Sequence, residues 1–355
     1  MSTHAGVHAP LVDLVLDAAH EAHEPPEARG VRRDQVRLLV SPGSAAPVDT
    51  RFDQLGAHLR GGDVLVVNTS ATLPAALDGR LPDGDPVVVH VAGRLPGGVW
   101  LVEVRHPAGG ASVPARLEHA VDVELLAAGH VRLLARFEDS ARLWVAQVDV
   151  PTSLFEHLRA HGRPIRYRHV RDEWPVAAYQ TVFAREPGSA EMPSAARPFS
   201  VELVTDLVTR GVSIAPLVLH TGVSSLEGDE LPAPEPYRVP EPTAAVVNAA
   251  RQRDDRVVAV GTTVVRALAT VTDARGVVHP GTGWTDVVVR PDDGLPALDG
   301  LITGWHEPES THLMMLEAVA GRDALRAAYA AAWDLGYRWH EFGDSHLILR
   351  EDRSR

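Results

Sequence analysis

The chain has 355 residues, 45% of them hydrophobic, and a formal net charge of −13. This length is enough for two domains with a sizeable core, and the absence of cysteine excludes disulfides, thiolate nucleophiles, cysteine zinc sites and iron–sulfur clusters. No apolar run is long enough to span a membrane and the N-terminus lacks a signal-peptide layout, so we expect a cytoplasmic protein.

The first part of the chain predicts a polar lead-in and then two strands. Roughly the first thirty residues are polar and marked by prolines, which predicts a mobile or loosely packed segment. Apolar runs then predict strands at 36–40 and 63–67.

Short hairpins follow these two strands. Residues 85–106 predict two strands joined by a Pro-Gly-Gly turn, and residues 130–150 predict a second hairpin. Short strands at this spacing favour a small antiparallel β-barrel or sandwich. We therefore predict an inserted domain at 73–150 within a main domain formed by residues 1–72 and 151–355.

From residue 151 onward, apolar strands alternate with helical patterns. Strands are expected at 213–220 and 256–260. Helices are expected at 200–211, 242–253, 311–321 and 323–336, each of the last two ending near a glycine. This alternation predicts an α/β main domain with a mostly parallel sheet.

One strand of this sheet ends in the run GTTVVR. In α/β sheets, ligands bind at the carboxyl ends of strands. Gly261 permits a tight exit from the strand, and the hydroxyl of Thr262 or Thr263 can cap the following helix. Arg266 then falls in the first turn, where the helix dipole disfavours a cation by about 0.3–1 kcal/mol. Either an anionic substrate group or an internal salt bridge to an Asp or Glu would offset this cost.

Two histidines follow other strand ends. His220 lies in LVLHTG, and His306 lies in GWHEPEST, just before a helix capped by Ser310 or Thr311. An imidazole at such an exit is a candidate general base, although a histidine at a turn also serves as a structural hydrogen-bonding group. Asp344 could orient such a base or bind a ribose hydroxyl, or it could simply cap its own turn. The 18 histidines show no HExxH-type pairing, so no metal site is expected.

Every cation in this acidic chain is an arginine, since no lysine occurs. An acidic protein binds nucleic acid poorly without local basic groups, because phosphate neutralisation supplies most non-specific affinity. The densest basic run is HGRPIRYRHVRDEW, where Arg163, Arg166 and Arg168 offer guanidinium groups for phosphates. The alternative is a basic loop paired with the neighbouring Asp172 and Glu173.

Matching blocks along nearly the whole chain resemble one known family, the S-adenosylmethionine:tRNA ribosyltransferase-isomerases of queuosine biosynthesis. These blocks stand in the family's order. They are RLLV (37–40), GDVLVVN (62–68), LPAAL (73–77), HGRP (161–164), YQTVFA (179–184), LVLHTG (217–222), GTTVVR (261–266), WTDVVVRP (284–291) and LDGLITGWHEPEST (298–311).

Three departures from the family pattern concern the acceptor. The family's NDTR-like run appears as NTSA at residues 68–71, and a second family arginine falls at Ala76. The family's AAPTAGLHF-like run appears as EMPSAARPF at residues 191–199, which places Ala196 at a usual glycine and Pro198 at a usual histidine. We expect this segment to contact substrate.

The resemblance implies an α/β, barrel-like main domain carrying the β-barrel insert. It also implies transfer and isomerisation of the ribosyl part of S-adenosylmethionine onto a 7-aminomethyl-7-deazaguanine base in tRNA, giving epoxyqueuosine. S-adenosylmethionine is then a co-substrate, tRNA is a partner, and no further cofactor or obligate protein partner is expected. Tyr179 and Gln180, which open a matching block, join the expected substrate contacts. The alternatives are a paralogue with another acceptor and a non-catalytic nucleoside- or RNA-binding protein.

Overall fold

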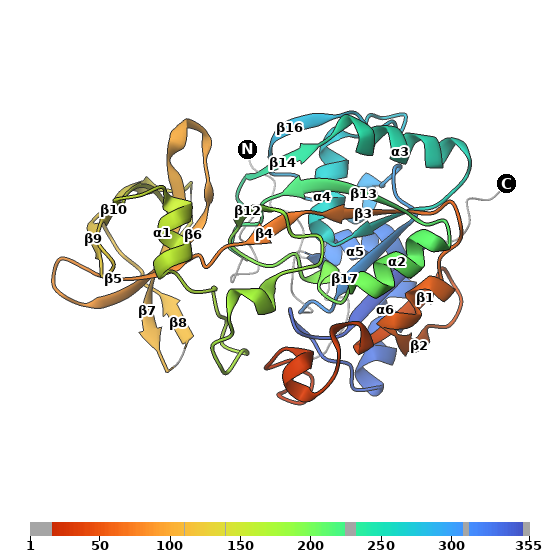
Figure 1. Ribbon diagram of the computed structural model, residues 1–355, viewed down its shortest axis with the longest axis horizontal. Helices are drawn as coiled ribbons and strands as arrows, with labels where there is room; N and C mark the ends of the chain where they lie inside the picture. Colours follow the sequence, from red (N-terminus) through yellow and green to blue (C-terminus); the bar gives the residue numbers. More distant parts are fainter. Residues whose placement is uncertain (1–15, 110, 139, 224–231, 308–311, 351–355) are drawn as a thin grey trace.

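The computed structural model describes residues 16–109, 111–138, 140–223, 232–307 and 312–350. A small β-barrel lies at one end and a larger α/β domain at the other (Figure 1). The chain passes from the large domain into the barrel through β4 (Ser70–Thr72), which pairs in parallel with β12 (Glu186–Ser189).

The barrel confirms the predicted antiparallel insert. Its hydrogen-bonded order is β11-β10-β9-β5-β6-β7, and the pairing of β11 with β7 closes six strands into a ring. The strands are β5 (Ala76–Arg80), β6 (Pro86–Arg94), β7 (Trp100–Ala108), β8 (Ala111–Pro114, paired only with β7), β9 (Asp122–Leu125), β10 (His130–Arg136) and β11 (Leu143–Asp149). Alternating valines such as Val102 and Val104 point into its core.

Helix α1 (Leu154–His161) closes one side of the barrel. It begins at a capping box, in which Ser153 Oγ accepts from the Glu156 amide at 3.3 Å and the Glu156 carboxylate accepts from the Ser153 amide at 3.2 Å. Leu154 and Leu158 pack in the same core as the barrel strands. Residue 150 as the domain boundary stays a prediction.

Within the described residues, the main sheet has nine strands in the order β16-β14-β13-β3-β15-β17-β18-β1-β2. They are β1 (Arg37–Pro42), β2 (Val48–Arg51), β3 (Val64–Asn68), β13 (Ser213–Leu219), β14 (Glu235–Val239), β15 (Val257–Val260), β16 (Gly281–Thr285), β17 (Gly300–Gly304) and β18 (Ser345–Leu349).

The prediction of a barrel-like, mostly parallel main domain is wrong in its detail. The sheet is open between β16 and β2, and of its eight neighbouring strand pairs four are parallel and four antiparallel. One cause is β18, which inserts between β17 and β1 and runs antiparallel to β17. The other is that β2 and β14 turn back on the strand that precedes them, so the edges are antiparallel.

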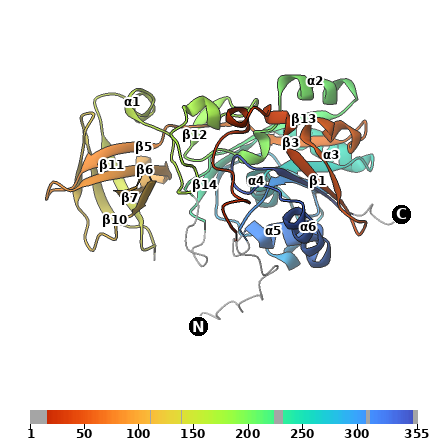
Figure 2. The same ribbon diagram turned by 90° about the horizontal axis from the view of Figure 1, so that it is seen from below.

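Helices cover both faces of this sheet. They are α2 (Val201–Thr209), α3 (Glu241–Gln252), α4 (Thr262–Val271), α5 (His312–Ala320) and α6 (Arg322–Asp334), while 3₁₀ turns span Pro26–Arg29, Arg33–Gln35, Phe52–Ala57, Pro96–Gly98, Val176–Tyr179, Ser194–Ala196 and Pro291–Asp293. In Figure 2, α2 lies on one side of the sheet and α5 and α6 lie on the other.

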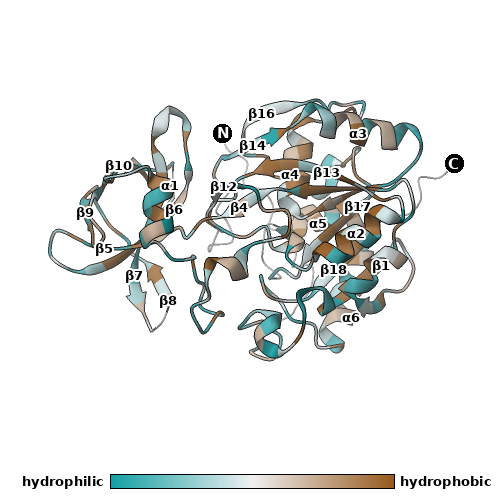
Figure 3. Ribbon diagram, in the orientation of Figure 1, coloured by the Kyte–Doolittle hydropathy of each residue, from teal (hydrophilic) through white to brown (hydrophobic). Residues whose placement is uncertain are grey.

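Strand β3 shows how the two cores arise. Its alternate side chains point to opposite faces, so Val64 and Val66 pack with α3 to α6, whereas Leu65 and Val67 pack with α2 and Phe199. Because both faces are covered, every residue of β3 and β15 is buried, and most of β13 is coloured hydrophobic in Figure 3.

The end of the N-terminal lead-in is packed rather than loose. The Trp339 amide donates to the His20 carbonyl at 2.7 Å, and the His20 ring stacks on Trp333 with centroids 3.7 Å apart. Ala22 is fully buried. The prediction of a loosely packed lead-in is therefore wrong for this part, because aromatic rings near the C-terminus supply a surface for it; residues 1–15 lie outside the described residues.

Acid is expected to destabilise the fold through His346 in β18. Burial lowers the pKa of this ring from 6.5 to about 3, and the ring stacks on Trp305 and bonds Ser41 Oγ at 2.8 Å. The folded state disfavours the protonated ring, so its stability is fully present above pH 6.5 and falls by about 1.4 kcal/mol per pH unit below that. The free energy of unfolding, measured in urea, should fall between pH 7 and pH 5 by about 2 kcal/mol less in His346→Asn than in wild type. Replacing the exposed His119 is the control and should leave this fall in unfolding free energy as in wild type. If His346→Asn also shows the wild-type fall, His346 is not the source of the acid sensitivity.

Candidate active site

Four central strands end at one edge of the main sheet. β13, β3, β15 and β17 are neighbours and mutually parallel, so their carboxyl ends meet. The residues there are Asn68, which ends β3, His220 and Gly261, which directly follow β13 and β15, and His306, two residues beyond β17. The sequence prediction that the histidines and Gly261 lie at strand ends is confirmed.

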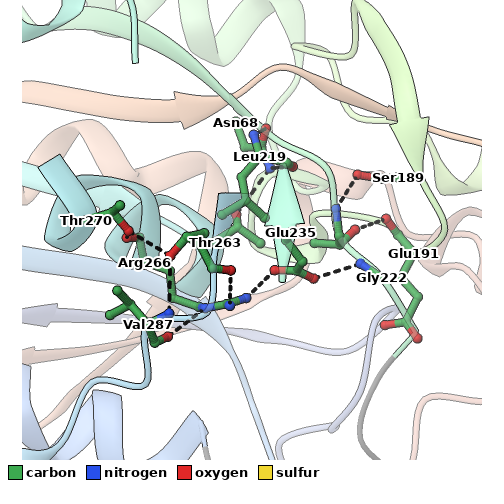
Figure 4. Close-up of polar contacts among 12 residues, drawn as sticks. Asn68, Ser189, Glu191, Leu219, Gly222, Glu235, Thr263, Arg266, Thr270 and Val287 are labelled. Carbon is green, nitrogen blue, oxygen red and sulfur yellow. Dashed lines mark hydrogen bonds and ion pairs between the residues drawn. The ribbon is translucent and has the colours of Figure 1, made fainter. Parts of the chain in front are cut away.

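Asn68 ties three elements of this edge together. Its Nδ2 donates to the Leu219 carbonyl at 2.8 Å and to Thr263 Oγ1 at 3.3 Å (Figure 4). Its Oδ1 accepts from the amides of Leu219 at 3.1 Å and Ser70 at 3.0 Å. The side chain is fully buried, so these bonds fix the relative position of β3, β13 and the start of α4.

A chain of hydroxyl groups holds the His220 ring. Ser70 Oγ lies 2.7 Å from His220 Nδ1 and 2.6 Å from Ser189 Oγ, and Ser189 Oγ accepts from the Thr221 amide at 3.0 Å. Gly188 lies against the ring, so close that a methyl group there would overlap it. Burial lowers the pKa of His220, helped by Arg238 and opposed by Glu186, so the ring is neutral at pH 7.

Counting donors and acceptors shows which group donates in each hydrogen bond between Ser189, Ser70 and His220. Both serines are fully buried, and a buried hydroxyl without a use for its proton is destabilising. Ser189 already accepts from an amide, so its proton goes to Ser70, and the Ser70 proton goes to His220 Nδ1. His220 Nδ1 is then an acceptor, and the neutral ring carries its proton on Nε2.

Arg266 lies in a buried ion pair. It is the fifth residue of α4, one turn later than the sequence analysis placed it, and its guanidinium donates to the Glu235 carboxylate (Figure 4). It also donates to the carbonyls of Val287 at 3.0 Å and Thr285 at 3.1 Å. Of the two alternatives weighed for this arginine, the internal salt bridge is the one that the structure shows.

Glu235, the ion-pair partner of Arg266, also contacts the loop after β13. Glu235 starts β14 and also accepts from the Gly222 amide at 2.7 Å, just beyond His220. Burial raises the pKa of Glu235, and the charge of Arg266 offsets part of that rise. The ion pair therefore braces the loop after β13 against α4.

The start of α4 has free backbone donors. Gly261 is its N-cap, with φ of 98°, which glycine tolerates without strain. The expected hydroxyl cap by Thr262 or Thr263 is wrong, because no side chain of the described residues caps this end and Thr263 Oγ1 instead accepts from Asn68. Among the described residues, the amides of Thr262 and Thr263 have no hydrogen-bond acceptor.

His306 is half-buried, as His220 is. Its ring stacks on His312 with centroids 4.5 Å apart, and its Nε2 lies 3.0 Å from Thr303 Oγ1. Burial lowers the pKa of His306 well below its usual range, with His312 and His340 adding to the effect. Ser310 and Thr311, expected to cap the next helix and bind substrate, lie outside the described residues.

Asp344 has the turn-capping role that the sequence analysis left open. Its Oδ1 accepts from the Arg37 amide and its Oδ2 from the Arg338 amide, both at 2.8 Å. Each oxygen is bonded to a backbone amide, and within the described residues no hydrogen bond joins Asp344 to His220 or His306. The structure therefore shows a structural role for this residue, and its catalytic role stays a prediction.

Tyr179 and Gln180 lie beside β4. The Thr72 hydroxyl donates to the Tyr179 carbonyl at 3.0 Å, and the Gln180 side-chain amide pairs with the Thr72 backbone at 3.1 and 2.8 Å. Tyr179 is 4% exposed. These bonds place the two residues next to the strand that carries Ser70.

The basic loop is only partly available to a ligand. Arg163 makes a bidentate ion pair with Asp78 of the barrel at 2.6 and 2.7 Å, and its Nε also lies 4.0 Å from the carboxylate of Glu173, one of the two neighbours expected. Arg166 donates to the Arg171 carbonyl at 2.9 Å. Arg168 is exposed and has no hydrogen bond or ion pair with the described residues.

The segment 191–199, which departs from the family pattern, lies at the same edge. The Thr221 hydroxyl donates to the Glu191 carbonyl at 2.7 Å, and the Ala195 methyl lies 3.5 Å from where a side chain on Gly261 would start. Ala196 is fully buried, and its φ is not positive, so its backbone does not require glycine. Pro198 lines a small hollow with Arg197.

The sequence analysis missed the groups that hold the site together. These are Asn68, Ser70, Ser189 and Glu235. Asn68 and Ser70 stand in the quoted blocks and runs, but Ser189 and Glu235 carry no local signal. Over the described ranges, no group of three or more His, Cys, Asp or Glu could hold a metal ion. No described helix has the length and apolar character needed to cross a membrane.

An α/β sheet with buried polar groups gathered at parallel strand ends is the layout of an enzyme site. The model of the family described as "Queuosine biosynthesis protein" matches residues 12–348. The chain therefore belongs to the queuosine biosynthesis protein family.

Named relatives match over almost their whole length. The S-adenosylmethionine:tRNA ribosyltransferase-isomerase of Moorella thermoacetica is 36% identical, over 95% of this chain and 98% of that protein. The protein of the same name from Symbiobacterium thermophilum is 38% identical, over 89% and 94%. A crystal structure of S-adenosylmethionine tRNA ribosyltransferase from Thermotoga maritima is 27% identical, with a TM-score of 0.53, over 96% of this chain and all of that one.

Proposed function

We propose that this protein is an S-adenosylmethionine:tRNA ribosyltransferase-isomerase. It transfers and isomerises the ribosyl part of S-adenosylmethionine onto a 7-aminomethyl-7-deazaguanine base in tRNA, giving epoxyqueuosine, with S-adenosylmethionine as co-substrate. The observation that carries this proposal is the match to relatives of that name along nearly the whole chain. The polar groups at the strand ends supply a site for the reaction.

The start of α4 is our candidate anchor for the methionine carboxylate. The amides of Thr262 and Thr263 point from a helix N-terminus, where backbone donors and the helix dipole favour an anion. Gly261 lets the strand turn into this helix. The ion pair between Arg266 and Glu235 holds α4 in place next to β14.

We assign His220 the role of a neutral hydrogen-bond donor, in place of the general base that its position alone suggested. The hydroxyl chain leaves the proton on Nε2, and a neutral imidazole donor can stabilise negative charge that develops as adenine departs. His306 is the proposed base. When its Nε2–H donates to Thr303, Nδ1 keeps the lone pair needed to take a proton from the carbon next to the sulfonium.

One assay tests the proposed function. The protein is incubated with S-adenosylmethionine, with and without tRNA that carries the deazaguanine base, and adenine, methionine and digested RNA are measured by mass spectrometry. Formation of epoxyqueuosine supports the proposal. Release of adenine with no modified tRNA would instead favour a different acceptor, as the changed segment 191–199 allows, and no release at all would favour a binding protein.

RNA contact is expected to involve the exposed part of the basic loop. Because each neutralised phosphate contact releases counterions, Arg168→Ala and Arg166→Ala should each lower the salt dependence of tRNA binding by about one unit of slope. Arg163→Ala is the matched comparison and should leave the slope unchanged, since Asp78 already neutralises this charge. Slopes measured by filter binding over a salt series check this. If Arg166→Ala and Arg168→Ala keep the wild-type slope, the loop does not contact the RNA.

A further inference from the structure

A cavity of about 320 Å³ lies between the barrel and the segment that follows α1. This volume is in the range of small-molecule pockets. Strands β6 to β8 form one wall, with His90 and Ser112 among the lining residues. The opposite wall carries Arg166, Trp174 and Tyr179.

Polar groups without partners line this cavity. His90 and Tyr179 are each only 4% exposed, yet neither ring nitrogen of His90 nor the hydroxyl of Tyr179 has a hydrogen bond within the described residues. The Glu103 carboxylate lies 3.9 Å from His90 Nδ1, beyond hydrogen-bond distance. Trp174 Nε1 is a third buried donor without a partner. Nearly all buried polar groups in proteins are bonded, and Trp174 Nε1 is a buried exception, whereas His90 and Tyr179 line the cavity itself. A ligand in the cavity would complete the hydrogen bonding of all three.

The three groups favour a planar ligand that both donates and accepts hydrogen bonds. Burial keeps His90 neutral, with a pKa of about 3, so its ring offers one donor and one acceptor. Tyr179 adds a hydroxyl that can do either, and Trp174 adds a donor. Aromatic rings and the Arg166 guanidinium provide flat surfaces on which a base can stack.

The cavity is joined to the strand-end site through β4. Thr72 bonds the carbonyl of Tyr179, and Ser70, two residues earlier on the same strand, bonds His220. At about 3.3 Å per residue the two bonds are some 7 Å apart along the strand. A base in the cavity can therefore present a substituent to a group bound at the strand ends.

We propose that this cavity binds the acceptor nucleobase of an RNA substrate, turned out of its stack. This inference rests on the proposed function. The rim favours a base carried by RNA over the adenine of S-adenosylmethionine, because Arg166 lines the cavity and the exposed Arg168 follows two residues later, where phosphates would lie.

Binding of two probes tests the assignment by calorimetry. Free 7-aminomethyl-7-deazaguanine and S-adenosylmethionine are titrated separately into wild type, Tyr179→Phe and Trp174→Leu. Loss of one neutral hydrogen bond in Tyr179→Phe should weaken binding of the free base about tenfold, and leave S-adenosylmethionine binding unchanged. Trp174→Leu should weaken the base further, because it removes a ring as well as a donor. Tyr337→Phe is the matched control, since that hydroxyl bonds Asp49 outside the cavity.

Three outcomes would overturn the assignment. If the cavity variants bind S-adenosylmethionine more weakly and the free base as wild type does, the cavity binds adenine. If they bind both probes as wild type does, the cavity holds only water. Absence of base binding in a wild-type protein that still modifies tRNA would reject the cavity but keep the proposed function. Conversely, base binding that Tyr179→Phe weakens, in a protein that never releases adenine, would support the cavity and reject the proposed function.

Discussion

Replacing Arg266 by alanine is expected to destabilise the folded protein by about 3–5 kcal/mol, the usual cost of leaving one member of a buried ion pair alone. Arg266 is 8% exposed and donates to Glu235 and to two backbone carbonyls, so its loss leaves all three acceptors without that donor. Within the described residues, the largely buried Glu235 carboxylate would keep only the Gly222 amide as a hydrogen-bond donor. Chemical unfolding at pH 7 measures this loss.

The size of the Arg266 effect should depend on pH. Burial already raises the pKa of Glu235, and removing Arg266 takes away the charge that opposes this rise. A carboxyl group whose folded pKa lies above its unfolded value favours the folded state in acid, and that advantage is lost as the pH rises through the folded pKa. The deficit of Arg266→Ala should therefore be smallest in acid and grow towards neutral pH.

A paired variant separates the ion pair from substrate binding. Arg266→Met combined with Glu235→Gln removes both charges at similar volume and should unfold close to wild type, as replaced buried ion pairs often do. If Arg266→Ala instead unfolds like wild type and binds S-adenosylmethionine more weakly, Arg266 anchors the substrate as the sequence analysis first suggested.

Local patterns predicted most elements of the fold but not the form of the main sheet. Hairpin spacing in residues 85–106 and 130–150 was sufficient for the barrel, because antiparallel neighbours in sequence are also neighbours in space. The open main sheet depends on β18, which pairs with β1 from the other end of the chain. No local period encodes which strand a distant segment will join, or in which direction.

For the site, too, the local sequence predicted where residues lie but not which distant residues they contact. Glycine-marked strand ends were enough to place His220, Gly261 and His306 at one edge. What each side chain does was decided by distant partners: Ser70 lies 150 residues before His220, and Ser189 lies 119 residues after Ser70. Arg163 likewise pairs with Asp78, 85 residues away, which changed its role from a free cation to a structural one.

Replacing His220 by alanine is expected to lower kcat by about 10²–10³-fold, the range for loss of one preorganised donor to developing negative charge. His220→Gln keeps an N–H donor near the position of Nε2 and should recover part of this loss. Single-turnover release of adenine from S-adenosylmethionine measures both. Equal rates for wild type and His220→Ala would remove His220 from the reaction.

Ser70 and Ser189 should act on the reaction only through the His220 ring. In wild type, ¹⁵N spectra of labelled histidine should show the His220 proton on Nε2, because Ser189 and Ser70 pass their hydroxyl protons towards Nδ1. Ser70→Ala removes the donor to Nδ1, so the ring should populate both tautomers and kcat should fall, while Ser70→Thr, which keeps the hydroxyl, should restore both. Ser213→Ala, an exposed change on β13, the strand that His220 follows, is the matched control and should alter neither. A wild-type spectrum with the proton on Nδ1 would reverse the bond directions and return His220 to the role of general base, with its Nε2 lone pair facing the substrate.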